Sequence, residues 1–178
     1  MAPQERTETE QNLERSRQEF LAAVAGLTES QAKARPDPER WSVLECVEHV
    51  AIVEERFLGW LEASERQAAP RIDKEKEAAL LARVSDRSTR AKAPEGAVPS
   101  GRFTTLEQAI EQFNAGRARS LQFAANRCDD LYYLSSTHPR FGPMNGVEFL
   151  IVIAGHARRH AAQILETRGA LEQSRNVE

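Results

Sequence analysis

The sequence of 178 residues is poor in cysteine, with only Cys46 and Cys128, and these do not form a C-x-x-C pair. Two thiols are too few for a disulfide framework, so we expect both to be small, buried apolar residues. Long apolar runs are also missing, because the longest, from Phe149 to Ala154, is far too short to span a bilayer. The opening residues MAPQERTETEQ lack the apolar core of a signal peptide, so we expect a cytoplasmic protein without membrane partners.

Charge of one sign does not predominate, since 24 basic and 27 acidic residues are well mixed and give a net charge of −3. Without a basic stripe a nucleic-acid partner is not expected. No run of alternating apolar and polar residues is long enough to indicate a strand, and the length suits one domain. We therefore expect a single all-α domain over residues 1–178, with its core at about 8–170.

The first half of the chain predicts two helices with apolar residues at helical spacing. One covers about 9–25 and stops at Gly26. The next starts at a capping box formed by Ser42 and Glu45 and continues to about residue 63. The stretch TESQAKARPDPER between them contains two prolines and few apolar residues, so it is interpreted as a connector.

The second half predicts two more helices. One starts near Thr105, and the other is capped by Asn145 and Glu148 and runs to Gly169. Residues 64–104, between the second and third helices, form a long connector with a possible short helix in KEKEAALLARV. The expected fold is thus a four-helix bundle with a long crossover between helices 2 and 3.

Three histidines give the sharpest chemical signal. His156 and His160 are four residues apart on the fourth helix, so both imidazoles can point at one metal ion. The alternative is a solvated, basic helix face that carries two histidines. A third ligand must come from another helix, and His49 borders the apolar stripe of the second one, whereas His138 lies in a loop and is expected to buttress the turn there.

The depths of these histidines in their helices test the pairing. His49 lies roughly 10 Å inside the start of helix 2, and His160 lies roughly 12 Å from the expected end of helix 4. These depths match only if the two helices are antiparallel. A bundle with short loops makes helices 2 and 4 parallel, so the site requires one long crossover, which residues 64–104 can provide.

The chain resembles the DinB-like superfamily in three segments, which are RWSVLECVEH at 40–49, HPRFGPMNGVEFL at 138–150 and GHARRHAAQI at 155–164. The resemblance implies an up-down-down-up bundle that holds a metal on one histidine of helix 2 and an H-x-x-x-H pair of helix 4. Members of the superfamily include metal-dependent transferases that act with low-molecular-weight thiols. Some members carry a further histidine five residues after the helix 2 ligand, where this chain has Glu54.

Three neutral imidazoles leave a divalent ion, Zn²⁺ or Ni²⁺, its full charge and an open coordination position. A thiol bound there loses its proton more easily and becomes a nucleophile. The functional hypothesis is a metal-dependent enzyme that uses a low-molecular-weight thiol as co-substrate and acts on a small molecule. The alternatives are a non-catalytic bundle whose metal only joins the helices, and a metal-independent binder of small ligands. A homodimer is expected, without an identifiable interface.

Glu54 is the candidate for a supporting acid, because a carboxylate inside a bundle is costly unless it has a partner. It can orient a metal ligand or relay a proton, or it can form an ion pair with an arginine such as Arg117. Gln163 is a candidate support for the site or a surface residue. Arg158 and Arg159 can attract an anionic substrate, although a solvated face is the simpler interpretation.

Overall fold

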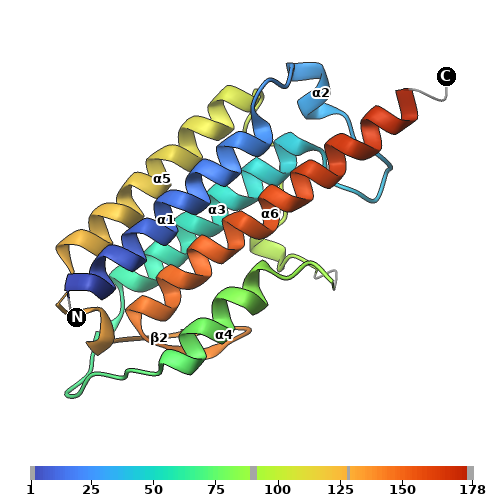
Figure 1. Cartoon of the computed structure of the whole chain (residues 1–178). Helices are drawn as coiled ribbons and strands as arrows, with labels where there is room; N and C mark the ends of the chain where they lie inside the picture. Colours follow the sequence, from blue (N-terminus) through green and yellow to red (C-terminus); the bar gives the residue numbers. More distant parts are fainter. Residues whose placement is uncertain (1–2, 89–91, 128, 176–178) are drawn as a thin grey trace.

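The computed structural model describes residues 3–88, 92–127 and 129–175, and within these ranges four long helices lie side by side as a bundle (Figure 1). They are α1 (Pro3–Val24), α3 (Val43–Glu62), α5 (Leu106–Asn126) and α6 (Gly146–Arg175). α1 packs against α5 and α6, and α3 packs against the same two helices. The expected helical bundle is therefore confirmed.

The colours of Figure 1 show the direction of each helix. α1 and α6 run from lower left to upper right, whereas α3 and α5 run the opposite way. α3 and α6 are thus antiparallel neighbours. This relation is the one that the depths of the histidines require.

The predicted helix starts of α3 and α6 are confirmed by their caps. The Ser42 hydroxyl accepts the backbone N–H of Glu45, whose carboxylate accepts the backbone N–H of Ser42. Asn145 and Glu148 exchange the same pair of bonds at 2.9 and 2.8 Å. Each box satisfies two amide groups that a helix start leaves without partners.

Helix α6 does not stop at Gly169, which corrects the expected end. The helix continues to Arg175, and its last turns extend beyond the other helices in Figure 1. A glycine inside a helix costs only about 1 kcal/mol relative to alanine, and the following Ala170, Leu171 and Glu172 are good helix formers. His160 therefore lies farther from the end of α6 than the expected stop at Gly169 implies.

Two connectors contain short helices. α2 (Glu29–Lys33) lies in a stretch interpreted as irregular, where Thr28 and Gln31 form a capping box. This short helix was not predicted, because the prolines that follow it favoured a connector over the whole stretch. Between α3 and α5, the expected short helix is present as α4 (Lys74–Ser85), capped by Asp73, and it packs along α6. The one-turn 3-10 helix η1 (Glu95–Ala97) follows, and a second such turn, η2 (Leu131–Tyr133), precedes the strands below.

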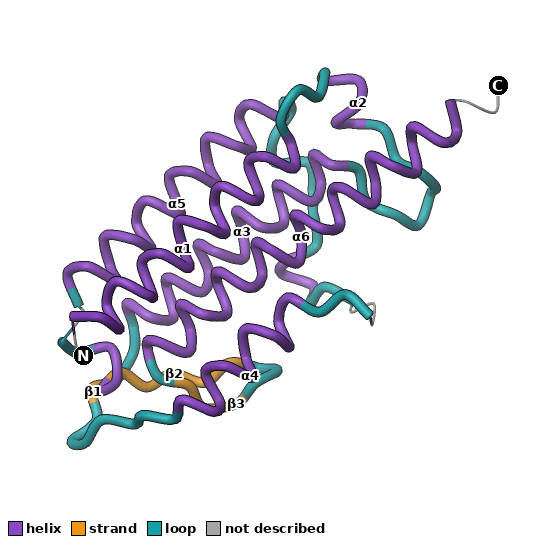
Figure 2. Tube along the Cα trace, in the orientation of Figure 1, coloured by secondary structure: helices purple, strands orange, loops and turns teal. Residues whose placement is uncertain are grey.

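A small sheet corrects the expectation of a purely helical fold. It consists of β1 (Glu65–Arg66), β2 (Leu134–His138) and β3 (Gly142–Met144), all antiparallel, in the order β1-β2-β3 (Figure 2). The pairs Arg66 with Leu134 and His138 with Gly142 set the register. Strands of two to five residues are too short for an alternating pattern to stand out in the sequence.

The core has two apolar clusters, and the histidines lie at the level where they meet. On α3 one cluster takes residues up to Ala51 and the other begins at Val53. On α6 the change falls between Ala154 and Ala157. The start of α6, residues 147–154, is fully enclosed as predicted, and no helix among the described residues is long and apolar enough to cross a membrane.

Candidate metal centre

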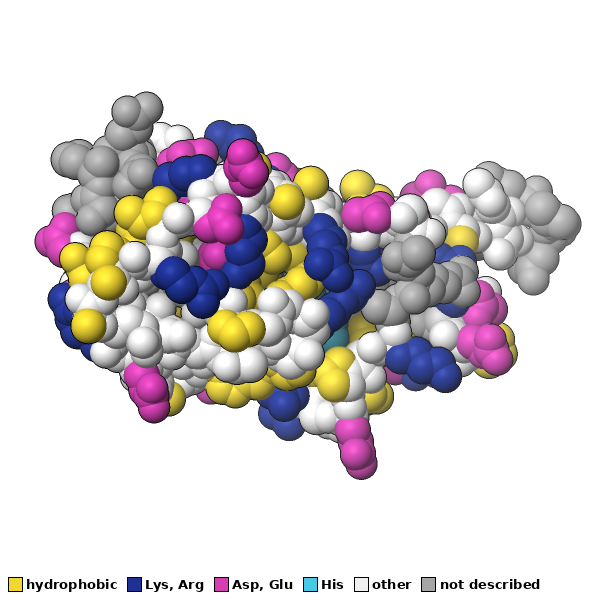
Figure 3. Space-filling model, turned by 90° about the horizontal axis from the view of Figure 1, so that it is seen from below, with side chains coloured by type: hydrophobic (Ala, Val, Ile, Leu, Met, Phe, Trp, Pro, Cys, Tyr) yellow, Lys and Arg dark blue, Asp and Glu magenta, His cyan; other side chains and the backbone are white. Residues whose placement is uncertain are grey.

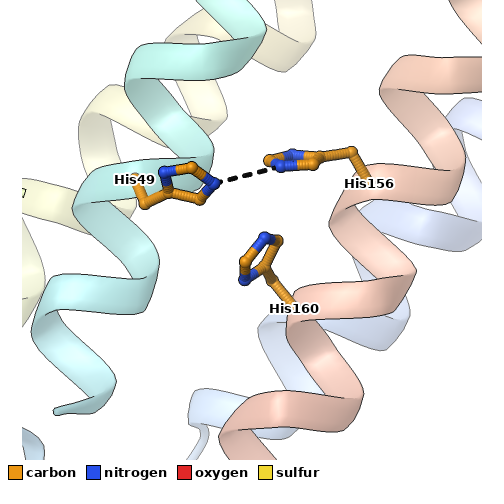
Figure 4. A group of neighbouring side chains, drawn as sticks. All are labelled: His49, His156 and His160. Carbon is orange, nitrogen blue, oxygen red and sulfur yellow. Dashed lines mark hydrogen bonds between the residues drawn. The ribbon is translucent and has the colours of Figure 1, made fainter. Parts of the chain in front are cut away.

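The structure brings His49, His156 and His160 together between α3 and α6 (Figure 4). The three ring centroids are 4.5 to 5.0 Å apart, and one ligand nitrogen from each ring lies within 4.8 Å of the others. All three side chains point into the space between the two helices. Two residues four positions apart on α6 and one from the antiparallel α3 thus form a three-sided group, as their spacing predicts.

The orientation of His49 is fixed by the connector. Its Nδ1–H donates to the carbonyl oxygen of Ala97 in η1 at 2.6 Å. The proton therefore sits on Nδ1, and Nε2 presents a lone pair to the group. This Nε2 faces Nε2 of His156 at 3.1 Å. Ala97, from the connector between α3 and α5, was not foreseen as part of the site.

These donors fit a divalent cation. Two imidazole nitrogens on one tetrahedral ion are about 3.3 Å apart if each bond is about 2.05 Å long. The His49–His156 separation of 3.1 Å is close to this value. The buried Nδ1 of His160 has no hydrogen-bond partner among the described residues. A buried nitrogen without a partner is costly, which favours a ligand or a water molecule beside this ring.

Burial favours the neutral form of the three imidazoles. It lowers the pKa of His49, although the bond to Ala97 opposes this effect. The pKa values of His156 and His160 lie well below the usual value, first because both rings are buried and then because neighbouring histidines and arginines repel a proton. A neutral imidazole has the lone pair that a metal requires.

The group forms part of the wall of a cavity of about 930 Å³. Trp41 lies against the site, with its rings 4.9 Å from the His49 ring and 6.4 Å from the His160 ring. Among the described residues no fourth histidine, cysteine or acid joins the group. Three protein donors beside a cavity leave room for a small molecule, as in catalytic rather than structural zinc sites.

Glu48, next to His49, anchors the connector and was also missed. Its carboxylate is 1% exposed and accepts the backbone N–H groups of Ser100, Gly101 and Arg102 at 2.7, 3.1 and 3.2 Å. These bonds hold the segment that carries Ala97. The sequence analysis did not single out Glu48, because nothing near it in the sequence identifies its partners.

Glu54 lies in a different network from the histidines. Its two oxygens accept hydrogen bonds from Arg117 at 2.6 and 3.0 Å, and one also accepts the Ser120 hydroxyl. The guanidinium group of Arg117 further donates to the Leu13 carbonyl and the Ser16 hydroxyl. Both members of the pair are buried. The ion pair, one of the two interpretations of Glu54, is thus present, and no hydrogen bond among the described residues joins Glu54 to the three histidines.

The remaining candidate residues from the sequence have other roles than binding the metal. His138 buttresses its turn, as expected, since its Nδ1 accepts the backbone N–H groups of Arg140 and Phe141 at 3.0 and 3.3 Å. Gln163 accepts a hydrogen bond from Arg87. Arg158 pairs with Glu19 of α1.

Arg159 faces the cavity, unlike Arg158. Its pKa is lowered by burial and then by the positive charges of Arg87 and Arg140. Basic side chains (dark blue) border the recess in which histidine surface (cyan) is visible in Figure 3.

Cys46 packs in the core as expected, and Cys128 lies outside the described residues.

Comparison with known proteins finds one matching family model and a related bacterial protein. The model of the DinB superfamily matches residues 12–164. Uncharacterized protein YuaE of Bacillus subtilis (strain 168) is 23% identical over 159 residues, which cover 89% of this chain and 96% of that protein.

Two solved structures share the fold. YfiT from Bacillus subtilis is described as a probable metal-dependent hydrolase with an unusual four-helix bundle topology; it aligns with a TM-score of 0.61 and 16% identity over 97% of this chain and 90% of its own. TT2238, described as a four-helix bundle protein, aligns with a TM-score of 0.51 and 22% identity over 94% and 98% of the two chains.

Proposed function

Because the chain belongs to the DinB superfamily, we propose that it is a metal-dependent enzyme that holds one divalent ion on His49, His156 and His160. The single observation that carries the proposal is the convergence of three neutral imidazoles on the wall of an open cavity. Zn²⁺ and Ni²⁺ are the leading ions, since both accept imidazole ligands readily. The helix directions in Figure 1 support an up-down-down-up topology, in which the connector reverses the second half of the bundle.

We propose thiol transfer to an electrophilic small molecule as the reaction. A divalent ion in this position would lower the pKa of a thiol bound at the open coordination position. The thiol sulfur would then form a bond to the electrophilic carbon while the leaving group departs, and the thiol proton would pass to solvent. The chain contributes by keeping the His49 lone pair aimed at the site through Ala97 and by covering the site with Trp41.

A hydrolytic reaction is the second candidate, because YfiT is described as a probable metal-dependent hydrolase. Water would then take the place of the thiol as nucleophile. The non-catalytic alternative, in which metal only joins α3 to α6, is disfavoured by the cavity, because a purely structural site closes with a fourth protein ligand.

The test combines metal binding with turnover in protein purified without a histidine tag. We expect one metal ion per chain by elemental analysis, and consumption of monobromobimane that depends on both an added thiol and the metal. His49→Ala, His156→Ala and His160→Ala should each weaken metal binding by about 100-fold or more, since even changes in the residues around metal ligands cost 10–100-fold. His138→Gln is the matched control for metal binding alone, because it removes a cavity histidine that lies outside the group, and it should bind the metal like the wild type.

Three results separate the candidates. Thiol-dependent turnover that a chelator abolishes supports the transferase. Ester cleavage without thiol, likewise abolished by the chelator, supports the hydrolase. A chelator that lowers the thermal midpoint while neither reaction occurs favours the structural metal. Unchanged metal binding in His49→Ala would disprove the proposed site.

A further inference from the structure

The cavity above the histidines is strongly basic, although the chain as a whole has a net charge of −3. Its acidic side chains are Glu39 and Glu166. Its basic side chains are Arg40, Arg56, Arg83, Arg87, Arg140, Arg159 and Lys92. With neutral histidines, the lining therefore has five more positive than negative charges, an excess that attracts anions into a concave site.

Three of these arginines have no carboxylate partner among the described residues, namely Arg56, Arg83 and Arg140. Instead each guanidinium group lies against an aromatic ring that lines the same cavity. The Cζ atom of Arg56 is 5.0 Å from the Trp60 ring, and those of Arg83 and Arg140 are 5.2 and 5.7 Å from the Phe141 ring. A guanidinium group on an aromatic face keeps its N–H edge free, and this edge matches a carboxylate or phosphate group in two parallel hydrogen bonds.

The other arginines that lie over aromatic rings among the described residues are paired with carboxylates, which distinguishes these three. Arg66 and Arg127 also lie over aromatic rings, those of Tyr133 and Phe123, but both are within salt-bridge distance of Asp130. Arg87, in the cavity, is neutralised by two short contacts with Glu166. Arg83 and Arg140 thus combine free charge with a shared ring at one end of the cavity.

A row of aromatic rings connects that end to the histidines. The Phe141 ring lies 4.8 Å from His138, His138 lies 5.1 Å from Phe57, and Phe57 lies 6.2 Å from His156. Burial lowers the pKa of His138 to about 4, so this ring adds no charge near neutral pH. The row offers apolar surface between a basic end and the candidate metal centre.

We infer that the cavity binds an organic anion, with a carboxylate or phosphate group between Arg83 and Arg140 and an apolar body along Phe141, His138 and Phe57. The inference rests on the proposed function in that it names the substrate class of the same cavity. The reactive end of such a molecule reaches the histidines, while its charge is held at the opposite end. The anion site itself requires no metal.

The test uses chelator-treated protein and two probes of nearly the same shape. Anilinonaphthalene sulfonate is an aromatic anion, and N-phenylnaphthylamine is its uncharged counterpart. The double variant Arg83→Gln/Arg140→Gln is compared with Arg66→Gln/Arg127→Gln, which removes the same charge and the same type of aromatic contact outside the cavity. Fluorescence titration gives each dissociation constant, and circular dichroism checks that each variant is folded.

We expect the cavity variant to bind the anionic probe about tenfold more weakly or worse, since hydrogen bonds to charged groups are worth roughly twice as much as neutral ones. The control variant should bind it like the wild type, and the uncharged probe should bind all three proteins alike. Equal binding of the anion by both variants, parallel loss of the uncharged probe, or no binding by the wild type would overturn the inference. If the double variant does not fold, Arg83→Gln and Arg140→Gln are measured singly, with smaller losses expected.

Displacement from the wild type identifies the anionic group. Phenylacetate displacing the probe assigns a carboxylate, and phenyl phosphate displacing it more strongly assigns a phosphate; displacement by neither rejects the site. Since no metal is present, these results are independent of turnover. Intact anion binding without metal-dependent turnover would reject only the proposed reaction, and turnover without anion selectivity would reject only this inference.

Discussion

Cys46 lies one helical turn before His49, yet its side chain is fully buried in the apolar cluster that also contains Phe20 and Phe113. Burial raises the pKa of its thiol to about 12. Near neutral pH the group is therefore a protonated thiol, and a thiol reacts or binds metal only as the thiolate. The residue packs the core rather than serving the site.

This assignment predicts that Cys46 resists alkylation. In Cys128→Ser protein, where Cys46 is the remaining cysteine, iodoacetamide at about pH 8, near the pKa of a free thiol, should leave the native chain unlabelled. The same reagent in concentrated denaturant should label it fully, and mass spectrometry measures both. Rapid labelling of the native chain would contradict the burial of this thiol.

The hydrogen bonds of His138 lead us to expect that the stability of the chain depends on pH. Its Nδ1 accepts two backbone N–H groups, so a proton on that atom breaks both bonds, and burial lowers its pKa to about 4. The unfolded chain binds this proton near pH 6.5, hence the unfolded state holds more protons between about pH 6.5 and 4, and stability falls as the pH falls through that window.

Replacement of His138 by Gln should flatten this dependence. Urea unfolding of metal-free protein at several pH values should give a slope smaller than that of the wild type by up to about 1.4 kcal/mol per pH unit. The histidines of the site still titrate in both proteins, so the difference between the two curves isolates His138. Identical slopes would show that its ring does not change charge on unfolding.

At the level of elements, the connector between α3 and α5 helps to build the site. Glu48 holds three backbone N–H groups of residues 100–102, and Ala97 upstream holds His49. Glu48→Gln should cost about 1–3 kcal/mol of stability, because a buried charged acceptor is lost. Metal affinity should fall by about tenfold, since the support of a ligand is loosened.

Urea unfolding and a metal titration measure both effects. Glu111→Gln, which changes an exposed acid of α5, is the control and should alter neither quantity. A loss of stability without any loss of metal affinity would mean that His49 keeps its orientation without this anchor.

A substitution at Gly169 tests whether α6 continues through this residue. Its backbone is helical and an added Cβ meets no atom within 4 Å, so Gly169→Ala should stabilise the chain by about 0.5–1 kcal/mol. A glycine that ended the helix in the left-handed region would give the opposite sign, as alanine at Gly26, with φ of +74°, should do. Thermal unfolding of the two variants distinguishes these cases.

For the whole molecule, the buried pair Glu54–Arg117 joins α1, α3 and α5. Glu54→Gln leaves the Arg117 charge without its partner and should cost about 3–5 kcal/mol, whereas the double change Glu54→Leu/Arg117→Met should cost much less. The pair Glu62–Arg119 links the same helices α3 and α5 at the surface and is the control. Glu62→Gln should cost less than about 1 kcal/mol in the same urea unfolding experiment.

The sequence alone predicted the parts that local patterns determine. Apolar periodicity located the long helices, the capping box at Ser42 located the start of α3, and the spacing of His156 and His160 located one side of the site. The contacts of Ala97 with His49 and of Glu48 with residues 100–102 join segments about fifty positions apart. No local pattern encodes such contacts, and the same holds for the short strands.

Dimerisation stays a prediction. The large exposed apolar side chains among the described residues are Ile72 before α4, Val98 after η1 and Leu165 on α6, so they lie in separate segments. Single exposed apolar residues are normal on monomers and do not define an interface. Sedimentation velocity at several concentrations measures the state directly.

The three candidate metal ligands and the residues of the proposed anion site come from separate parts of the chain. The three imidazoles stand on two bundle helices, while Arg83 comes from α4 and Arg140 and Phe141 come from the turn between β2 and β3. Changing the cavity-facing side chain of Arg83 or the residues of the hairpin tip therefore alters what fits in the cavity, while the donor atoms stay on α3 and α6. The scaffold is suited to directed evolution of substrate choice, with libraries confined to those two segments.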